Sequence, residues 1–329
     1  MASINLIVYD NGIGLSRDVR LLADALRQGA HTVSVSLLDS DRRGRRGGIR
    51  GLVERYAEAL RRRSLPGPQH DINLMIERVR PLFARRARVN LLLANPDWFK
   101  PSDARYFALL DGILVKTRHA EPIFATLGKT VVQVGFTGDD RLLPAIARER
   151  AFFHLAGRSK AKGTARLLAL WQRHPEWPRL TVLQHPHRRL AHVSAPNIDH
   201  RIGIVDDSDL KRLQNAHAFH LCPSETEGFG HYIVEAMSVG ALTVTVDASP
   251  MNELVTPERG VLVACTACGT QSLATTWRFQ EAAMEHAIES IRAMHDDEIV
   301  AIGTHARAWF EANDRAFRTR IMQCIANWT

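Results

Sequence analysis

The sequence is poor in cysteine and contains no long hydrophobic run. Its 329 residues include four cysteines, Cys222, Cys265, Cys268 and Cys324. They are too few and too irregular for a disulfide framework, so we expect a protein of the reducing cytoplasm. Cys265 and Cys268 have Cys-x-x-Cys spacing, but no second cysteine or histidine pair completes a zinc site. No run of about 18 apolar residues predicts a membrane span, and the N-terminus lacks the basic head and cleavage site of a signal peptide.

Positive charge is in excess. The formal net charge is +8, which favours anionic partners such as nucleotides, acidic glycans, nucleic acid or an anionic membrane. Much of the excess lies in the stretch from Arg42 to Arg50, which is interleaved with glycine, and in Arg61 to Arg63. The glycines predict a loop for the first stretch. No aromatic residues interleave it, so we expect no nucleic-acid partner.

Short apolar strands alternate with amphipathic helices along the chain. This alternation predicts an α/β fold with parallel sheets. A break at residues 137–140 separates two halves of similar size, and we expect a helical stretch from about Thr276 to the end. The predicted strands are residues 4–9, 32–38, 72–76, 90–94, 112–115 and 130–136 in the first half, and 152–156, 180–183, 202–205, 218–222, 242–246 and 260–263 in the second.

The most informative segment is residues 221–240. A buried strand ends at Cys222, a polar turn follows, and a helix is predicted to begin near Gly230 or His231. Glycines in the turn, Gly228 and Gly230, let the backbone approach a ligand, and the free N–H groups of a helix start favour phosphate. Glu227 and Glu235 lie close to this predicted anion site. Such carboxylates are expected to accept hydrogen bonds from hydroxyls, which a ribose and a sugar supply.

This segment resembles the Glu-x7-Glu element of the retaining glycosyltransferases of family 4, which have the GT-B fold. The resemblance implies that Glu235 binds the ribose hydroxyls and that Glu227 lies near the donor sugar. Residues 152–163 are similar to the family's strand, Gly-Arg turn and Lys-Gly helix start. There, Arg158 and Lys162 would hold the donor pyrophosphate and stabilise the departing nucleoside diphosphate. The turn is shorter than in the family, so Lys160 is an alternative ligand.

The resemblance extends over residues 150–264, with its parts in the family's order. Asp206 and Asp207 could be read as a metal pair, but capping of the following helix is the preferred interpretation. Read without the resemblance, the charged residues of these turns could also be solvated loop and cap residues.

The first half resembles the family more loosely. Gly12 and Gly14 follow the first strand, where the family has a glycine-rich loop that approaches the donor pyrophosphate. Asn95, Asp97 and Trp98 follow another strand, where many relatives have a histidine that this chain lacks. They either contact sugar hydroxyls and a sugar face or form an Asx-Pro turn with a core tryptophan. Lys116, after the next strand, is a further acceptor-side candidate.

These resemblances imply a GT-B architecture, two Rossmann-like domains with parallel sheets facing across a cleft. The expected domains are an acceptor-side domain of residues 1–138, a nucleotide-sugar-binding domain of residues 139–305 and a closing helix of residues 306–329 that crosses back. The expected donor-binding residues are Gly12, Gly14, Lys160, Gly228, Phe229, Gly230, His231, Tyr232 and Glu235, beside the catalytic candidates Arg158, Lys162 and Glu227.

The function expected from this resemblance is a retaining hexosyltransferase of polysaccharide biosynthesis. It would move a sugar from a UDP- or GDP-sugar to a glycan or lipid-linked acceptor, with no metal and no cofactor, in the cytoplasm or at the inner face of an anionic membrane. Two alternatives remain open at this point. One is a phosphorylase or epimerase of the same fold, and the other is a non-catalytic protein that binds anionic ligands.

Overall fold

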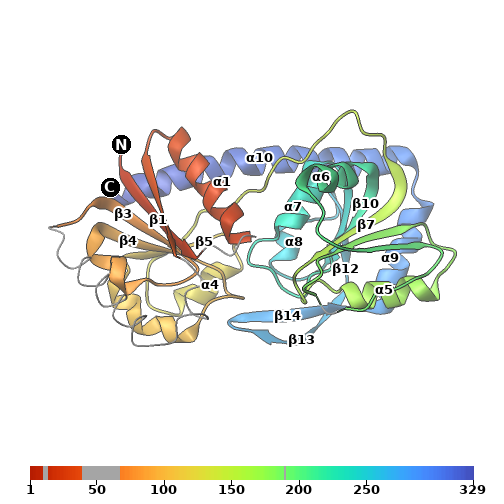
Figure 1. Cartoon of the computed structure of the whole chain (residues 1–329), viewed down its shortest axis with the longest axis horizontal. Coiled ribbons are helices and arrows are strands. Elements are labelled where there is room, and N and C mark those ends of the chain that lie inside the picture. Colours follow the sequence, from red (N-terminus) through yellow and green to blue (C-terminus); the bar gives the residue numbers. More distant parts are fainter. Residues whose placement is uncertain (10–13, 39–66, 189) are drawn as a thin grey trace. The chain divides into compact units, whose positions relative to one another are not determined.

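A computed structural model describes residues 1–9, 14–38, 67–188 and 190–329. The chain divides into two compact units (Figure 1). Unit 1 consists of Met1–Phe136 and Ala316–Thr329, and unit 2 of Thr137–Arg315. The arginines from Arg42 to Arg50 and from Arg61 to Arg63 lie outside the described residues, as does Gly12.

Unit 1 contains a six-stranded sheet in the order β2-β1-β3-β4-β5-β6. All of its pairings are parallel. Because neighbouring strands run in the same direction, their carboxyl ends lie at one edge, where ligands of open α/β sheets bind. The strands are β1 (Ser3–Tyr9), β2 (Thr32–Leu38), β3 (His70–Ile76), β4 (Ala87–Ala94), β5 (Gly112–Val115) and β6 (Val131–Gln133).

Helices and 3₁₀ turns connect these strands: α1 (Gly14–Gln28), η1 (Pro81–Arg86), η2 (Pro101–Leu109) and α4 (Ala120–Ala125). The end of the last helix, α10 (Asp296–Trp328), also belongs to unit 1. Phe317 of α10 packs against Phe136 with ring centroids 5.0 Å apart. Arg320 donates a hydrogen bond from Nε to the carbonyl oxygen of Val134 at 3.0 Å. The final helical turns therefore form part of the core of unit 1.

Unit 2 contains a second six-stranded sheet, in the order β12-β11-β10-β7-β8-β9. Its pairings are also all parallel. The chain starts in the middle of the sheet at β7 and later returns to β10, which lies beside β7. The strand order therefore reverses between β7 and β10, and ligands of such sheets bind at this reversal. The strands are β7 (Glu149–Gly157), β8 (Leu180–Gln184), β9 (Ile198–Ile202), β10 (His217–Leu221), β11 (Leu242–Val246) and β12 (Val261–Val263).

The helices of unit 2 cover both faces of this sheet. They are α5 (Thr164–Arg173), α6 (Asp207–Ala216), α7 (His231–Ser238), α8 (Met251–Leu254), α9 (Glu281–Ala293) and the first part of α10. Figure 1 shows α6 and α7 on the opposite side of the sheet from α5 and α9. Right-handed crossovers require this arrangement, because the chain leaves β7 in one direction and returns to β10 and β11 in the other.

Three predicted elements differ from the structure. The strand predicted at 202–205 lies instead at Ile198–Ile202, where alternate residues point inward and His200 is buried. The strand predicted at 130–136 ends at Gln133, before Gly135 with a φ of 71°. The helical stretch predicted from about Thr276 begins instead at Glu281, since Ala274–Phe279 (β14) pairs antiparallel with Cys265–Gln271 (β13). Thr275, Thr276 and Trp277 are residues that favour a strand.

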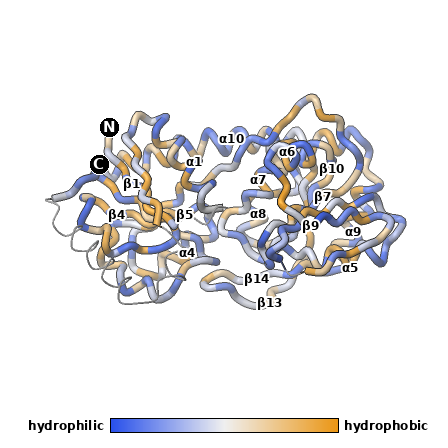
Figure 2. Tube along the Cα trace, viewed as in Figure 1, coloured by the Kyte–Doolittle hydropathy of each residue, from blue (hydrophilic) through white to orange (hydrophobic). Residues whose placement is uncertain are grey.

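Each unit has its own hydrophobic core. Figure 2 shows hydrophobic residues along the strands of both sheets. In unit 1, Ile4, Leu6 and Ile7 are fully buried, and in unit 2, Trp171 lies edge-on to Phe152 at 5.1 Å. Within the described residues, no helix is long and apolar enough to span a membrane.

Candidate functional site

The carboxyl edge of the unit 2 sheet places a helix start beside several charged side chains. Helix α7 begins after Gly230, which has a φ of 107°. This left-handed conformation is open to glycine and rarely to other residues. A Cβ at Gly230 would also lie 3.0 Å from Cδ1 of Leu254. The sequence therefore fixes a sharp turn that presents the free N–H groups of α7 at this edge, where they favour an anion.

Lys162 and Glu227 form an ion pair at this edge. Lys162 Nζ lies 3.2 Å from Oε1 of Glu227 and 3.0 Å from the centroid of the Tyr232 ring. Ser224 donates a hydrogen bond to Glu227, and its Oγ lies 2.6 Å from the Tyr232 hydroxyl oxygen. Burial raises the pKa of Tyr232 well above its usual value, so its hydroxyl stays protonated. Of the two lysines that the sequence left as alternatives, Lys162 contacts the glutamate, and Lys160 is exposed.

Glu235 is buried within α7, at 1% exposure. Gln214 of α6 donates a hydrogen bond from Nε2 to Oε2 of Glu235 at 2.9 Å. The Gln214 amide is held in turn by Arg141, whose Nε donates to Oε1 at 2.8 Å. Arg141 also pairs with Asp207 at 2.8 Å. This relay from α6 fixes the orientation of the Glu235 carboxylate, which has lone pairs for further donors.

Three loops at this edge are joined through their backbones. The N–H of Glu225 donates to the carbonyl oxygen of Ala161 at 2.7 Å, and the N–H of Trp277 in the β13–β14 hairpin donates to the carbonyl oxygen of Glu225 at 2.7 Å. Gly163, with a φ of 66°, allows a close approach, since a Cβ there would lie 2.8 Å from the Pro223 carbonyl oxygen. The loops after β7 and β10 therefore hold each other in place.

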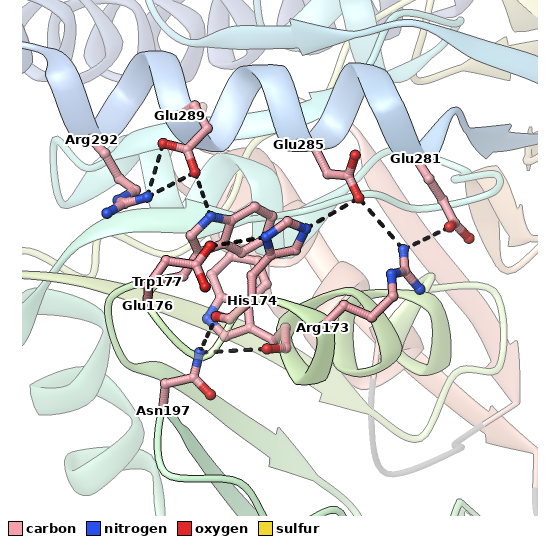
Figure 3. Close-up of polar contacts among 10 residues, drawn as sticks. Arg173, His174, Glu176, Trp177, Asn197, Glu281, Glu285, Glu289 and Arg292 are labelled. Carbon is pink, nitrogen blue, oxygen red and sulfur yellow. Dashed lines mark hydrogen bonds and ion pairs between the residues drawn. The ribbon is translucent and has the colours of Figure 1, made fainter.

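Helix α5 is anchored at its far end to α9 (Figure 3). Trp177 donates a hydrogen bond from Nε1 to Glu289 at 2.6 Å, and His174 Nε2 lies 3.3 Å from Oε1 of Glu285. Arg173 pairs with Glu281 at 2.8 Å. Burial lowers the pKa of His174, but its hydrogen bonds to Glu176 and Glu285 outweigh this and raise it overall. These contacts fix α5, whose amino end lies at the candidate site.

The remaining donor-side candidates take different positions. Arg158 and Lys160 are exposed in the loop after β7. Phe229 is buried, with its ring centroid 5.4 Å from that of His231, and Gly228 lies in the bend before them. Asp206 caps α6 by accepting a hydrogen bond from the Asp209 N–H at 2.8 Å, as predicted. Among the described residues, no group of three or more His, Cys, Asp or Glu side chains is placed to hold a metal ion.

The carboxyl edge of the unit 1 sheet carries a separate buried polar cluster. Lys116, after β5, forms an ion pair with Asp18 of α1, and both are almost fully buried. Asn95, after β4, donates a hydrogen bond from Nδ2 to Oε1 of Glu77 at 3.2 Å. Glu77 has a φ of 61°, a conformation that costs a non-glycine residue about 1–2 kcal/mol. Burial raises the pKa of the Glu77 carboxyl, and the charge of Lys116 partly offsets this.

The other acceptor-side candidates also lie at or near this edge. Asp97 is buried, whereas Trp98 is 62% exposed, so its interpretation as a core residue is wrong. The backbone turns here, with the Phe99 N–H donating to the Asn95 carbonyl oxygen at 3.0 Å, but the predicted Asx turn is not formed, because Oδ1 of Asn95 is buried and accepts no hydrogen bond from the described residues. Gly14 is the first residue of α1.

Several residues of these clusters were not among the sequence candidates. They are Asp18 and Glu77 in unit 1, and Arg141, Gln214 and Ser224 in unit 2. Glu77 directly follows β3. Its position at the carboxyl end of a predicted strand could have identified it as a site residue. For Asp18 and Gln214, which lie within helices, only the folded structure shows that the side chain faces a charged partner.

The comparisons with known proteins agree with this geometry. Residues 198–275, which include β10, the Glu227 turn and α7, match the family model described as Glycosyl transferases group 1. This segment is therefore similar to the corresponding part of the group 1 glycosyl transferases. No curated protein sequence matches the chain significantly.

Solved structures show that the fold extends over the whole chain. Anabaena HepE in complex with UDP and glucose has a TM-score of 0.70 at 12% identity, with 99% of this chain and 100% of that chain covered. A Rickettsia africae glycosyltransferase has a TM-score of 0.70 at 13% identity, covering 99% and 98% of the two chains. A Thermosynechococcus elongatus sucrose-phosphate synthase also has 0.70, at 14% identity, covering 99% of each chain. The predicted α/β GT-B fold class is thus confirmed.

Proposed function

We propose that this glycosyltransferase moves a sugar from a nucleoside-diphosphate sugar to a glycan or lipid-linked acceptor, with retention of anomeric configuration. The observation that carries the proposal is the arrangement of Lys162, Glu227 and Glu235 around the start of α7. At one sheet edge, it combines positive groups that can bind phosphate with carboxylates that can accept hydrogen bonds from sugar hydroxyls. The crystal structure of the similar Anabaena protein with UDP and glucose supports a nucleotide donor, and UDP and GDP remain the candidate nucleotides.

In this proposal, cations and backbone dipoles stabilise the leaving group. Arg158, Lys162 and the amino end of α7 would take up charge as the nucleoside diphosphate departs, because preorganised positive groups act most strongly where negative charge develops. Lys160 would add to the positive potential from its exposed position. Glu235 would accept hydrogen bonds from the ribose hydroxyls, and Glu227 would face the donor sugar.

The Lys162–Glu227 pair has a specific consequence for this chemistry. Before the donor binds, Glu227 neutralises Lys162 and keeps it in position. A diphosphate that approaches Lys162 competes with Glu227, and the glutamate is then available to accept a hydrogen bond from a sugar hydroxyl. We expect Lys162→Ala to weaken diphosphate binding, and Glu227→Gln to reduce transfer more than it reduces nucleotide binding.

The remaining parts of the site follow the same reasoning. Gly228, Gly230, Phe229, His231 and Tyr232 would shape the donor pocket. Asn95, Asp97, Trp98 and Lys116 of unit 1 are proposed to serve the acceptor. Because Arg158 and Lys162 can neutralise the diphosphate, we propose that transfer needs no metal ion and no cofactor.

Binding calorimetry tests the donor assignment. UDP, GDP, ADP and their common sugar conjugates would be titrated, with EDTA present, into the wild type and Glu235→Ala. We expect one nucleotide to bind, with affinity reduced about tenfold or more in the variant, because hydrogen bonds to a charged group contribute about 1.5–3 kcal/mol. Absence of nucleotide binding by the folded wild type would contradict the donor assignment.

Product analysis tests the reaction type. With the identified donor, transfer to an acceptor and the anomeric configuration of the product would be read by NMR. Retained configuration with activity in EDTA is the expected result. Activity that depends on inorganic phosphate would indicate a phosphorylase instead.

A further inference from the structure

Arg188 lies in the loop that follows β8, at the carboxyl edge of the unit 2 sheet. Gln184, the last residue of β8, donates hydrogen bonds from Nε2 to the carbonyl oxygens of Arg188 at 3.2 Å and of Leu190 at 2.8 Å. The N–H of Arg188 closes a turn by donating to the His185 carbonyl oxygen at 3.0 Å. The backbone that presents Arg188 is therefore held by a buried side chain.

The guanidinium of Arg188 donates from Nη1 to Oγ1 of Thr164, the first residue of α5, at 2.6 Å. Thr164 also bonds to Nε2 of His154 at 2.8 Å, while Nδ1 of His154 lies 2.8 Å from the Leu221 carbonyl oxygen. A carbonyl accepts only, so His154 must carry its proton on Nδ1 and accept at Nε2. Burial lowers the pKa of His154 to about 3, so it stays neutral. Thr164 thus donates to His154 and accepts from Arg188.

The charge of Arg188 has no counter-ion among the described residues. The residue is 8% exposed, yet none of the carboxylates in the described ranges pairs with it. Burial lowers its pKa, and the more distant charge of Glu225 offsets this only in part. The amino end of α5, with its positive dipole, and Lys162 add to the positive potential around Thr164. A buried cation without a partner destabilises a fold by several kcal/mol in general.

Arg141 in the same unit shows how the charge of a buried arginine is usually neutralised. It is 4% exposed and forms an ion pair with Asp207 at 2.8 Å, while its Nε donates to Gln214 at 2.8 Å. Among the described residues, the guanidinium of Arg188 makes one hydrogen bond, to a neutral hydroxyl. None of its other guanidinium nitrogens is both fully buried and without a hydrogen-bond partner. These nitrogens therefore retain some contact with solvent. The missing counter-ion therefore has access to them.

We propose that Arg188 is a ligand of the phosphate groups of the nucleoside-diphosphate donor, which provide its counter-ion. This inference rests on the proposed function and adds a residue from the loop after β8 to those of the loops after β7 and β10. The phosphates would lie beside the amino end of α5, against the guanidinium nitrogens of Arg188 that do not bond to Thr164. Guanidinium suits this place because its planar fork can give two parallel hydrogen bonds to phosphate.

The test compares Arg188→Met with wild type in binding and stability. Inorganic pyrophosphate, UDP and uridine would be titrated calorimetrically in EDTA, and thermal unfolding would be followed without ligand. We expect the variant to bind pyrophosphate and UDP about tenfold or more weakly, with uridine binding unchanged. Without ligand, its Tm should rise by about 2–4 °C, because the methionine removes an unpaired buried charge.

Two control variants show the results expected if Arg188 acted only through net charge or only as a structural residue. Arg179→Gln removes an exposed cation that pairs with Glu149 just before β8, so it reports the effect of net charge alone, and we expect pyrophosphate affinity close to wild type. Arg141→Met removes the paired buried arginine and should lower the Tm, the opposite of Arg188→Met.

Each outcome separates this inference from the proposed function. If the wild type binds UDP and Arg188→Met binds it with the same affinity, the inference is overturned and the proposed function stays intact. A lower Tm in Arg188→Met would also overturn it, because the arginine would then be a structural residue. Pyrophosphate binding that requires Arg188, without binding of any nucleotide, would support the anion site and contradict the proposed function. No binding of pyrophosphate or nucleotide by the wild type would overturn both.

Discussion

The carboxyl edges of the two sheets carry charge in different ways. At the edge of unit 1, Lys116 and Asp18 are both buried and neutralise each other. At the edge of unit 2, Lys162 has a carboxylate partner, whereas Arg188 is buried and has none among the described residues. Arg158 and Lys160 add exposed positive charge there. Unit 1 therefore has a balanced polar core at this edge, and unit 2 has an excess of positive charge.

This difference indicates which edge requires an anion. A closed buried pair is complete without a ligand and contributes to the fold as long as both partners are present. An excess of cations beside helix amino ends raises the local potential and attracts negative ligands. This contrast supports the proposal that the donor diphosphate binds at unit 2, and that the neutral and balanced groups of unit 1 serve hydroxyls. Four substitutions test this contrast.

The largest effect is expected in unit 1. Lys116→Met leaves Asp18 buried without its partner, and we expect the free energy of unfolding to fall by about 3–5 kcal/mol. Urea denaturation followed by circular dichroism measures it. The double variant Lys116→Met/Asp18→Leu removes both charges and should recover most of the loss. If the double variant is as unstable as the single one, an uncompensated Asp18 charge is not the cause of the loss.

A smaller loss is expected at the turn before α7. Gly230→Ala places a Cβ at a φ of 107° and 3.0 Å from Leu254, which should cost about 1–2 kcal/mol and weaken nucleotide binding. Gly203→Ala is the matched control, since a Cβ there meets no atom within 4 Å. Equal stability of the two variants in urea would show that the turn is not constrained as described.

Lys162→Met should change stability less, by about 1 kcal/mol or below. Its side chain and that of Glu227 retain 16% and 17% exposure, and partly solvated pairs contribute little. Nucleotide binding should fall in the same variant. The contrast between the two edges would fail if Lys162→Met destabilised the protein as strongly as Lys116→Met.

The smallest expected effect is a dependence of stability on pH, caused by Glu77 in unit 1. Because burial raises the pKa of Glu77 above its usual value of 4.5, its ionisation costs stability as the pH rises through the folded-state pKa. Glu77→Gln, which keeps an acceptor for Asn95, should be more stable than wild type at pH 7. The difference should vanish below about pH 4.5.

Urea midpoints from pH 4 to 8 would measure this effect. Glu121→Gln, at an exposed position of α4, provides the control and should follow the wild-type curve. If Glu77→Gln gave a constant offset across the whole range, ionisation of Glu77 would not be its cause.

The sequence predicted most of the sheet strands because their apolar runs are short and bounded by turn residues. β2, β5 and β11 have the predicted bounds. The β13–β14 hairpin was missed because β13 consists largely of small and polar exposed residues, without the alternation that marks a half-buried strand. The carboxyl-edge positions of Lys162, Glu227 and Glu235 followed from their places after buried strands.

The contacts that complete the site could not be predicted in this way. Arg188 belongs to an Arg-Arg pair in a polar loop, where sequence reasoning expects solvated side chains. Its burial depends on Gln184, four residues earlier at the end of β8, and on Thr164, 24 residues away in the chain. Gln214 is likewise an ordinary helix residue until the fold places it against Glu235. Such long-range pairs have no local sequence pattern.

The backbone links among the loops of unit 2 have a consequence for how this protein can diverge. Glu225 joins two neighbouring segments through its own N–H and carbonyl groups, one link to Ala161 and one to Trp277. Neither link uses a side chain, so most residue types at position 225 or 277 would preserve the loop geometry. Substitutions there can change the chemical character of this sheet edge while the loop conformation is inherited. If the proposed function holds, new donor preferences can therefore evolve without a new loop conformation.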